Sequence, residues 1–520
     1  MAVRLGEMQL SGGRLARRGA VEDVEYAIGV DVGTTNSKVV LCELPSCSVL
    51  HVVKFESPKR TDGDGHVDFD VTALERKLID ALAQSVSYAR DGKVAFVSIA
   101  SVGESGVLVF PDGTHSETSI AWFDTRGAAY ADELHATGEA RRFYEVTGIP
   151  AHANYGLFKL LWMRDHGARL DGAMWLPLGD YIAWWLCGEA NQDESLASRT
   201  FMLDMVGRCP AQEILERYGL GESVVPPLME SGIPRGAVRR EIVRQTGLSD
   251  GCKVCVAGHD HMAGSVACSL AEQGELLNST GTSEGILTLN EHPVLTEESF
   301  TRRLSNGIYV RGGLYSYYAS LPTAGYALSW LCDTLAYEED SFFGPYREGI
   351  SRQYLEAEFR GRELLFIPHL RGSGPPRRSV NARGCVYGIS DSTTREDIVF
   401  SSYLGLAFEF KQLFDCMIGD RRAASYTVAK VTGPAVRSTL WMQLKADVLG
   451  IEARACRVDE PVARGAAMLA AQKAGYDVDF DFDYVSYHPD AERHKYLTDL
   501  YESQYVPLTK QIALFEDECR

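Results

Sequence analysis

The sequence predicts an α/β protein with two similar domains that face one cleft. Residues 28–41 and 275–288 support this prediction, because each consists of an apolar strand, a small polar turn and a second apolar strand. Their turn glycines, Gly33 and Gly281, lie about half a chain length apart. At 520 residues the chain is too long for a single hydrophobic core, so about two to four domains are expected.

Predicted strands and helices alternate along the chain, which is typical of an α/β fold. Residues 26–42 and 48–56 have the pattern of strands, and residues 94–100 form the continuous apolar run of a buried strand. Thr72 and Glu75 have the spacing of a capping box, which predicts the start of a helix. Further helices are predicted at residues 155–166, 179–188, 323–336, 395–417, 438–449 and 461–474.

The composition argues against several classes of partner. A net charge of −19 disfavours nucleic acids and anionic membranes, which attract basic surfaces. No apolar run approaches the roughly 18 residues that a membrane span needs. Twelve scattered cysteines without a secretory signal favour a reducing compartment, so we expect the protein in the cytoplasm. Residues 1–25 are predicted to be a flexible N-terminal tail.

The turn after Asp31 has the composition of a phosphate-binding site. Gly33 lets the backbone approach an anion, and Thr34, Thr35 and Asn36 supply hydroxyl, amide and N–H donors. Asp31 would repel a bare phosphate, so its expected role is at a Mg²⁺ ion that the phosphates also bind. The alternative is an ordinary hairpin whose turn is rich in Gly and Thr.

Asp260 is the candidate catalytic base. It follows the apolar strand predicted at residues 253–257, and phosphorylation of an alcohol needs a carboxylate that accepts the hydroxyl proton. The alternative is that Asp260 caps the helix predicted at residues 262–270. His259 and His261 flank it, but alternate residues of a strand end point in opposite directions, so polar or packing roles are favoured over a metal site.

A second small-residue loop runs from Gly433 to Ser438. It follows a predicted strand and precedes a predicted helix, so it has room for a flat ring or a phosphate at the helix start. The alternative is an ordinary turn between a strand and a helix.

Taken in order, these motifs resemble those of the FGGY carbohydrate kinases, which include xylulokinases, fuculokinases and glycerol kinases. The D-x-G-T-T-x-S loop of that family is similar to residues 31–37, its G-T-S loop to residues 281–283, and its adenosine loop to residues 432–438. Further family elements resemble Trp122, Asp124 and Arg126, residues 159–166, residues 384–402 and residues 465–470.

The resemblance implies two ATPase domains of the actin, hexokinase and Hsp70 type, a ribonuclease H-like fold, on either side of a catalytic cleft. It places an N-terminal kinase domain at residues 26–257 and a C-terminal kinase domain at residues 258–490. Residues 491–520 are then expected to be a C-terminal helical extension.

The resemblance also implies an ATP-dependent kinase that phosphorylates a terminal hydroxyl of a ketose or polyol, with ATP and Mg²⁺ as cofactors. A small sugar or polyol is the expected partner, and a homodimer is an assembly that the resemblance allows. The implied site residues are Asp260 as base; Asp31 for Mg²⁺; Glu104, Trp122, Asn154 and Asp260 for the sugar; Gly33, Thr34, Thr35, Asn36, Gly281, Thr282 and Ser283 for the phosphates; and Gly433, Pro434 and Ser438 for the nucleotide.

Several positions depart from the family's pattern. Pro434 and Ala435 replace loop glycines near the adenine, and proline removes a backbone donor. Glu284 directly follows the second phosphate loop, where it either points away along the strand or joins the metal. Gly103 and Gly285 stand where the glycerol-specific branch has bulkier residues, so we expect them to open the pocket for a substrate larger than glycerol.

Two other functions remain open at this point. An actin-like or Hsp70-like ATPase that drives partner binding would share the phosphate turns and the adenosine loop. A degenerate kinase that serves as a sugar sensor or scaffold is motivated by Pro434 and Ala435.

Overall fold

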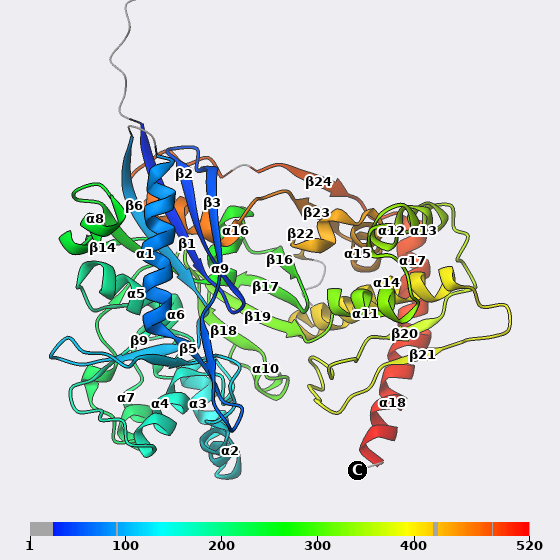
Figure 1. The fold of residues 1–520 in the computed structure, drawn as a ribbon. Helices are drawn as coiled ribbons and strands as arrows, with labels where there is room; N and C mark the ends of the chain where they lie inside the picture. Colours follow the sequence, from blue (N-terminus) through cyan, green and yellow to red (C-terminus); the bar gives the residue numbers. More distant parts are fainter. Residues whose placement is uncertain (1–23, 90–91, 420–424, 481, 519–520) are drawn as a thin grey trace, which may run out of the picture.

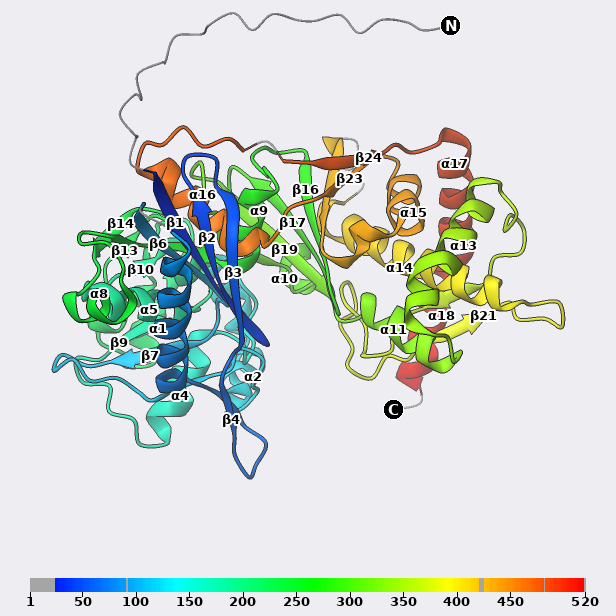
Figure 2. The same ribbon diagram turned by 45° about the horizontal axis from the view of Figure 1, so that its top comes forward.

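The computed structural model describes residues 24–89, 92–419, 425–480 and 482–518. The predicted N-terminal tail lies outside the described residues, except for residues 24 and 25. Two α/β halves lie side by side (Figures 1 and 2). Within the described ranges, no helix is both long enough and apolar enough to cross a membrane.

The first half is built on a six-stranded sheet. In spatial order its strands are β14 (Pro234–Ala237), β15 (Lys253–His259), β6 (Lys93–Ser101), β1 (Glu25–Val32), β2 (Asn36–Glu43) and β3 (Ser48–Glu56). Strands β1, β2 and β3 are antiparallel neighbours, whereas β6 pairs with both β1 and β15 in parallel. The predicted strands at residues 26–42, 48–56 and 94–100 are confirmed, the first of them as the hairpin of β1 and β2.

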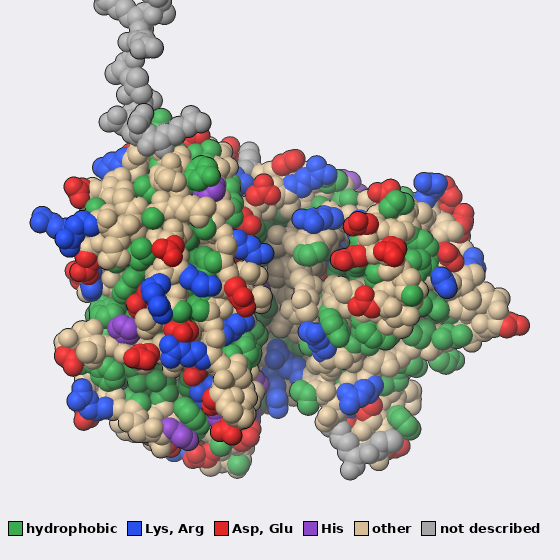
Figure 3. Space-filling model, viewed as in Figure 1, with side chains coloured by type: hydrophobic (Ala, Val, Ile, Leu, Met, Phe, Trp, Pro, Cys, Tyr) green, Lys and Arg blue, Asp and Glu red, His purple; other side chains and the backbone are tan. Residues whose placement is uncertain are grey.

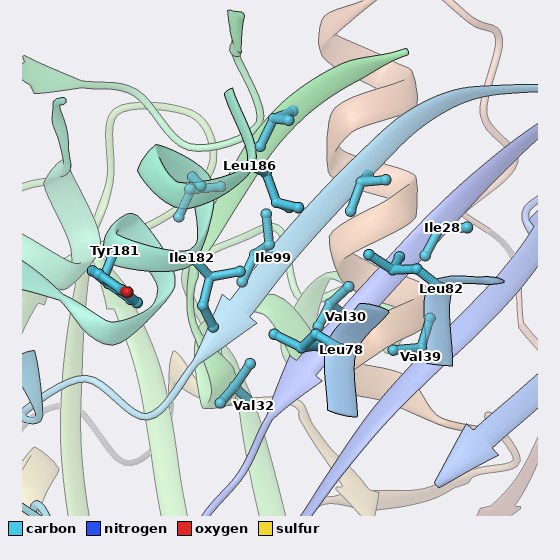
Figure 4. Close-up of a cluster of buried hydrophobic side chains, with 14 of the residues drawn as sticks. Ile28, Val30, Val32, Val39, Leu78, Leu82, Ile99, Tyr181, Ile182 and Leu186 are labelled. Atoms are coloured by element: carbon cyan, nitrogen blue, oxygen red, sulfur yellow. The ribbon is translucent and has the colours of Figure 1, made fainter. Parts of the chain in front are cut away.

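Helices α1 (Val71–Ser87) and α5 (Leu178–Cys187) cover one face of this sheet. The helix predicted from the capping box is present, but the box itself is wrong, because the N-cap is Asp70, which accepts a hydrogen bond from Ala73 N at 3.0 Å. Figure 4 shows how side chains of both helices meet those of β1, β2 and β6 in the buried cluster that contains Ile28, Val30, Val32, Val39, Leu78, Leu82, Ile99, Tyr181, Ile182 and Leu186.

The second half repeats this arrangement in a seven-stranded sheet. Strands β19, β17 and β16 are antiparallel, and β16, β22 and β23 are parallel, which matches β3, β2, β1, β6 and β15 of the first sheet. The predicted internal repeat is therefore confirmed. In spatial order the strands are β18 (Ser305–Ile308), β19 (Tyr315–Leu321), β17 (Glu284–Asn290), β16 (Glu275–Thr280), β22 (Val428–Thr432), β23 (Glu452–Cys456) and β24 (Tyr484–Tyr487).

Two helices, α9 (Asp260–Ala267) and α16 (Pro461–Lys473), pack together between the sheets (Figure 2). Glycines allow the contact: a Cβ atom on Gly465 would lie 2.0 Å from the carbonyl oxygen of Ala263, and one on Gly29 would lie 1.8 Å from that of Ala463. Their hydrophobic cluster includes residues of both sheets, so this helix pair joins the two halves.

The other predicted helices also form, within a few residues of the expected bounds. They include α4 (Gly156–Asp165), α11 (Gly325–Thr334), α14 (Arg395–Ile418) and α15 (Thr439–Leu449). The last two α-helices of the described residues are α17 (Ala491–Leu500) and α18 (Val506–Glu518). The domain boundaries expected from the sequence stay predictions. The shorter elements near the site are β4 (Lys59–Thr61), β20 (Leu365–Ile367), β21 (Cys385–Tyr387) and α6 (Glu194–Ala197).

Candidate active site

The first turn, residues 33–35, joins β1 to β2 at the edge of the cleft. Gly33 is required there, because a Cβ atom would lie 2.7 Å from the carbonyl oxygen of Asn36. The turn carbonyls are held from behind: Ser57 Oγ donates to Gly33 at 2.7 Å and Lys59 Nζ to Thr34 at 3.1 Å. With these oxygens engaged, hydroxyl and N–H donors remain to face an anion.

Asp31, at the end of β1, lies close to Asp260. Burial and the negative charge of Asp260 raise the pKa of Asp31 to about 7, and Lys38 opposes this shift. Two neighbouring carboxylates repel each other unless a proton or a cation lies between them. The donor set therefore fits Mg²⁺, which prefers one or two carboxylates together with phosphate oxygens.

The second turn, residues 281–283, joins β16 to β17 in the equivalent position. Gly281 N donates to Ser283 O at 2.8 Å, and Gly325 N donates to Gly281 O at 2.9 Å, so the start of α11 is bonded to the turn. A Cβ atom on Gly325 would lie only 2.6 Å from Gly281 O, which explains the glycine.

Glu284 points away from the cleft. Its buried carboxylate pairs with Lys445 of α15, whose Nζ atom also lies 3.9 Å from the centre of the Phe410 ring. Of the two orientations considered from the sequence, the one along the strand is confirmed and the metal contact is wrong. The pair anchors the second turn in the core of its own half.

The loop from Gly433 to Ser438 is bonded directly to the second turn. Gly433 has a φ angle of 92°, and a Cβ atom there would lie 1.9 Å from Thr280 O. Thr280 Oγ1 donates to Thr432 O at 2.8 Å and accepts from Ala435 N at 3.2 Å. Residues Pro434–Arg437 form a 3-10 helix with Pro434 at its first position, where no intrahelical N–H is needed.

Ser438 is the N-cap of α15 and accepts from Trp441 N at 3.2 Å. The lost donor at Pro434 therefore removes nothing from the local hydrogen bonding, and the loop keeps the strand-to-helix geometry expected at residues 432–438.

All four predicted sugar contacts, Glu104, Trp122, Asn154 and Asp260, line one cavity of about 250 Å³. Thr34 of the first turn and Ser283 of the second line the same cavity. The structure thus brings the candidate base, the predicted sugar contacts and one residue of each turn together. The remaining predicted phosphate and nucleotide residues belong to the same turns, to the first position of β2 and to the adjoining loop, but do not line this cavity: Gly33, Thr35, Asn36, Gly281, Thr282, Gly433, Pro434 and Ser438.

Trp122 links the cavity wall to the first turn. Its Nε1 atom donates to Thr34 Oγ1 at 2.7 Å. Behind it, Lys159 of α4 is fully buried and its Nζ atom donates to the carbonyls of Trp122, Ala153 and Asn154. Burial lowers the pKa of Lys159 to about 7. One lysine therefore holds two of the predicted sugar contacts in place.

Glu104 is paired with Arg199, which the sequence pattern did not indicate. Arg199 Nη2 and Nε lie 2.8 and 3.0 Å from Glu104 Oε1. Burial alone would raise the pKa of Glu104, but Arg199 and then His259 hold it below its usual value. Glu104 is thus an ionised acceptor, and no sequence spacing connects positions 104 and 199.

Asp260 is the first residue of α9, and His259 is the N-cap. The Asp260 Oδ1 atom accepts from His261 N, a backbone N–H of the first helical turn, at 2.6 Å. Asp260 therefore bonds to the start of the helix, as the capping alternative expected, although His259 rather than Asp260 occupies the N-cap position. The rings of His259 and His261 stack at 5.5 Å and line the same cavity. The expectation that they point apart is wrong, because the helix begins between them. Burial lowers the pKa of His259 to about 4, so its ring is neutral at pH 7.

Ser195 positions the strand end that carries Asp260. Its hydroxyl donates to Asp193 Oδ1 at 2.7 Å and accepts from His259 N at 3.0 Å. Gly258 has a φ angle of 92°, and a Cβ atom there would lie 2.0 Å from Ser195 Oγ. The bend that aims Asp260 into the cleft thus depends on a glycine and on a buried serine and aspartate.

The two glycines expected to enlarge the pocket do not do so. A Cβ atom on Gly103 would lie 2.4 Å from His259 Cδ2 and 2.8 Å from Arg199 Cγ. One on Gly285 would lie 2.8 Å from the hydroxyl oxygen of Tyr318. That expectation is wrong, because side chains from distant segments fill the space that each glycine leaves.

Comparisons with known proteins agree with this geometry. Models of the FGGY family of carbohydrate kinases match the chain, the N-terminal domain model over residues 26–267 and the C-terminal domain model over residues 276–474. A xylulose kinase of Bacillus subtilis is 25% identical over 93% of this chain and 97% of its own length. A glycerol kinase of Streptococcus pneumoniae is 26% identical over 88% of this chain and 91% of its own.

Solved structures show the same fold. The xylulose kinase of Rhodospirillum rubrum has a TM-score of 0.84 at 23% identity, over 95% of this chain and all of that one. The gluconate kinase of Lactobacillus acidophilus has a TM-score of 0.83 at 20% identity, over 96% of this chain and all of that one. With both family domains matched in order, this chain belongs to the FGGY carbohydrate kinases, ATP-dependent phosphotransferases with an alcohol group as acceptor.

Proposed function

We propose that the enzyme phosphorylates a terminal hydroxyl of a ketose or polyol in the cavity between the two turns, with Asp260 as the general base. The observation that carries this proposal is the convergence of Asp260, Glu104, Trp122 and Asn154 in one cavity that both turns border. Relatives that are named xylulose kinases and match nearly the whole chain support a pentulose as the acceptor.

Each residue has a role that its surroundings support. Glu104 and Asn154 accept or donate hydrogen bonds to substrate hydroxyls, and Trp122 offers an apolar face. Asp260 accepts the proton of the attacking hydroxyl, and the neutral ring of His259 lies beside it, with Nδ1 3.3 Å from Asp260 Oδ1.

The two turns and the loop from Gly433 to Ser438 would hold the triphosphate and the nucleoside of ATP. Asp31, with Asp260 nearby, would hold Mg²⁺, which supplies charge neutralisation for the transferred phosphoryl group. The cytoplasm as the compartment and a homodimer as the assembly stay predictions.

The test is Asp260→Asn, assayed by sugar-dependent ADP release with Mg²⁺ and ATP. Loss of a positioned general base lowers kcat by about 10²- to 10⁴-fold. Asp250→Asn makes the same chemical change at an exposed turn residue and should keep wild-type kcat. A kcat for Asp260→Asn within threefold of wild type, with a sugar KM also unchanged, would remove Asp260 as the base.

A further inference from the structure

The cavity is electrically polarised. Asp31 and Asp260 concentrate negative charge beside the first turn. Arg378, in the segment between β20 and β21, lines the cavity together with Asn154 and Tyr155. Figure 3 shows basic side chains gathered low in the groove between the two halves. This concentration contrasts with the chain as a whole, whose net charge is −19.

Arg378 differs from the other arginine of the cavity. Arg199 is buried and its charge is offset by Glu104 at 2.8 Å. In the part of the chain that the structure describes, no carboxylate forms an ion pair with Arg378, and its side chain stays exposed within the cleft. Arg378 is therefore available to a ligand, whereas Arg199 serves to orient Glu104.

Among the described residues, the charged or polar groups that act most strongly on Arg378 include Tyr155, Arg303 and Tyr318, and no carboxylate is among them. Burial and then the positive charge of Arg303 lower the pKa of Arg378, whereas Tyr155 and Tyr318 oppose this shift. After burial, the charges of Arg378 and Arg303 are the main causes that lower the pKa of His152. His152 is thus held neutral beside them. Two like charges gathered without a counter-charge are costly, and a bound anion would relieve that cost.

We propose that the carbohydrate substrate carries an anionic group, and that Arg378 binds this group beside Tyr155 while Arg303 strengthens the attraction. A guanidinium binds a carboxylate or phosphate through two parallel hydrogen bonds, which a hydroxyl cannot match. A neutral ketose or polyol would leave Arg378 without a counter-charge. This inference rests on the proposed function, since it names the substrate class of the same cavity.

The experiment measures ADP release by the full-length chain with Mg²⁺ and ATP. Neutral ketoses and alditols are compared with sugar acids of the same hydroxyl configuration, and sugar phosphates form a separate arm. We expect kcat/KM for the best sugar acid or sugar phosphate to exceed that of its neutral analogue by at least about tenfold. The arm with the higher value identifies the anionic group as a carboxylate or as a phosphate.

Arg378→Gln should lower kcat/KM for the anionic substrate by about 10- to 100-fold, chiefly through KM, because a charge-assisted hydrogen bond is lost. The same variant should change kcat/KM for a neutral sugar by less than threefold and leave the KM for ATP unchanged. Arg383→Gln is the matched control, because Arg383 is an exposed arginine of the same segment that does not line the cavity. If Arg378→Gln does not fold, the Arg303→Gln variant and the wild-type preference between anionic and neutral sugars still test whether the substrate is anionic.

The inference is overturned if the wild-type enzyme prefers neutral sugars, or if Arg378→Gln weakens ATP use and sugar use alike, which would assign Arg378 to the nucleotide phosphates. Absence of ADP release with every carbohydrate would instead contradict the proposed function. Titration calorimetry of sugar acids and sugar phosphates in the absence of nucleotide separates these failures. Anion binding that depends on Arg378 supports the inference even if there is no turnover. Lack of binding rejects the inference.

Discussion

The two predicted phosphate turns have the same strand-turn-strand backbone, but a different buried lysine lies behind each. Behind the first turn, Lys159 donates to carbonyl groups, among them that of Trp122, which in turn donates to Thr34. Behind the second, Lys445 pairs with the carboxylate of Glu284. Both turns line the cavity, through Thr34 and Ser283, but the lysine behind the first turn also holds Trp122 and Asn154 of the cavity wall, whereas Lys445 anchors the second turn within its own half. From this difference in anchoring we predict that the first turn contacts the acceptor and that the second serves as a fixed phosphate clamp.

The acidic residue at the first turn has no equivalent at the second. Asp31 occupies the position two residues before Gly33, and Ser279 occupies the same position before Gly281. This difference assigns the predicted metal contact to the first half.

Glu284→Ala should destabilise the protein by about 3–5 kcal/mol, because it leaves the Lys445 ammonium buried without its partner. Replacing both residues, Glu284→Leu with Lys445→Met, should recover most of that loss. Equilibrium denaturation in urea measures both effects. Asp499→Ala breaks the exposed pair with Lys495 and should cost no more than about 1 kcal/mol. Equal costs at the buried and the exposed pair would contradict the anchoring role.

Asp31→Asn should raise the Mg²⁺ concentration for half-maximal rate by about 10- to 100-fold, since a charged contact to the metal is lost. Ser279→Ala, at the equivalent position of the second turn, should shift it by less than twofold. Initial rates at saturating ATP over a range of free Mg²⁺ measure both. A similar shift in the two variants would mean that the turns share the metal equally.

Lys159 should make stability rise with pH. Its pKa is about 7 when folded and near 10.4 when unfolded, so between these values the unfolded chain binds more protons and folding is favoured as pH increases. From pH 7 to 9 we expect wild type to gain about 1–2 kcal/mol relative to Lys159→Met, measured by urea unfolding at each pH. Parallel pH profiles for the two proteins would show that Lys159 stays charged in the folded state.

Much of the fold follows from local sequence patterns. An apolar segment on each side of a small polar turn predicted the hairpins at Gly33 and Gly281, and each hairpin forms with the expected turn. The capping box predicts Thr72 as the N-cap of α1, but Asp70 occupies that position, because its side chain accepts the hydrogen bond of a helix N–H group. Cap choice depends on where the preceding strand ends, which a spacing rule alone does not state.

Some residues of the candidate site were likewise expected from the sequence, and others were not. The sugar contacts that the family resemblance implied do line one cavity. Arg199 and Arg378 are not among those contacts, and their roles arise only where distant segments meet. Gly103 and Gly285 were expected to widen the pocket from their size alone. Side chains of distant residues fill the space beside them, namely His259, Arg199 and Tyr318.

The two strand-turn-strand units, the residue types that can hold phosphate and the isolated carboxylate between them could be predicted from the sequence, because all three depend on neighbours within about ten positions. Three outcomes come from the tertiary structure: Glu284 faces Lys445 rather than the cleft, His259 and His261 share one wall, and no carboxylate of the described residues forms an ion pair with Arg378. These outcomes depend on packing between segments far apart in the chain, where burial and charge, rather than local pattern, set the arrangement of lowest free energy.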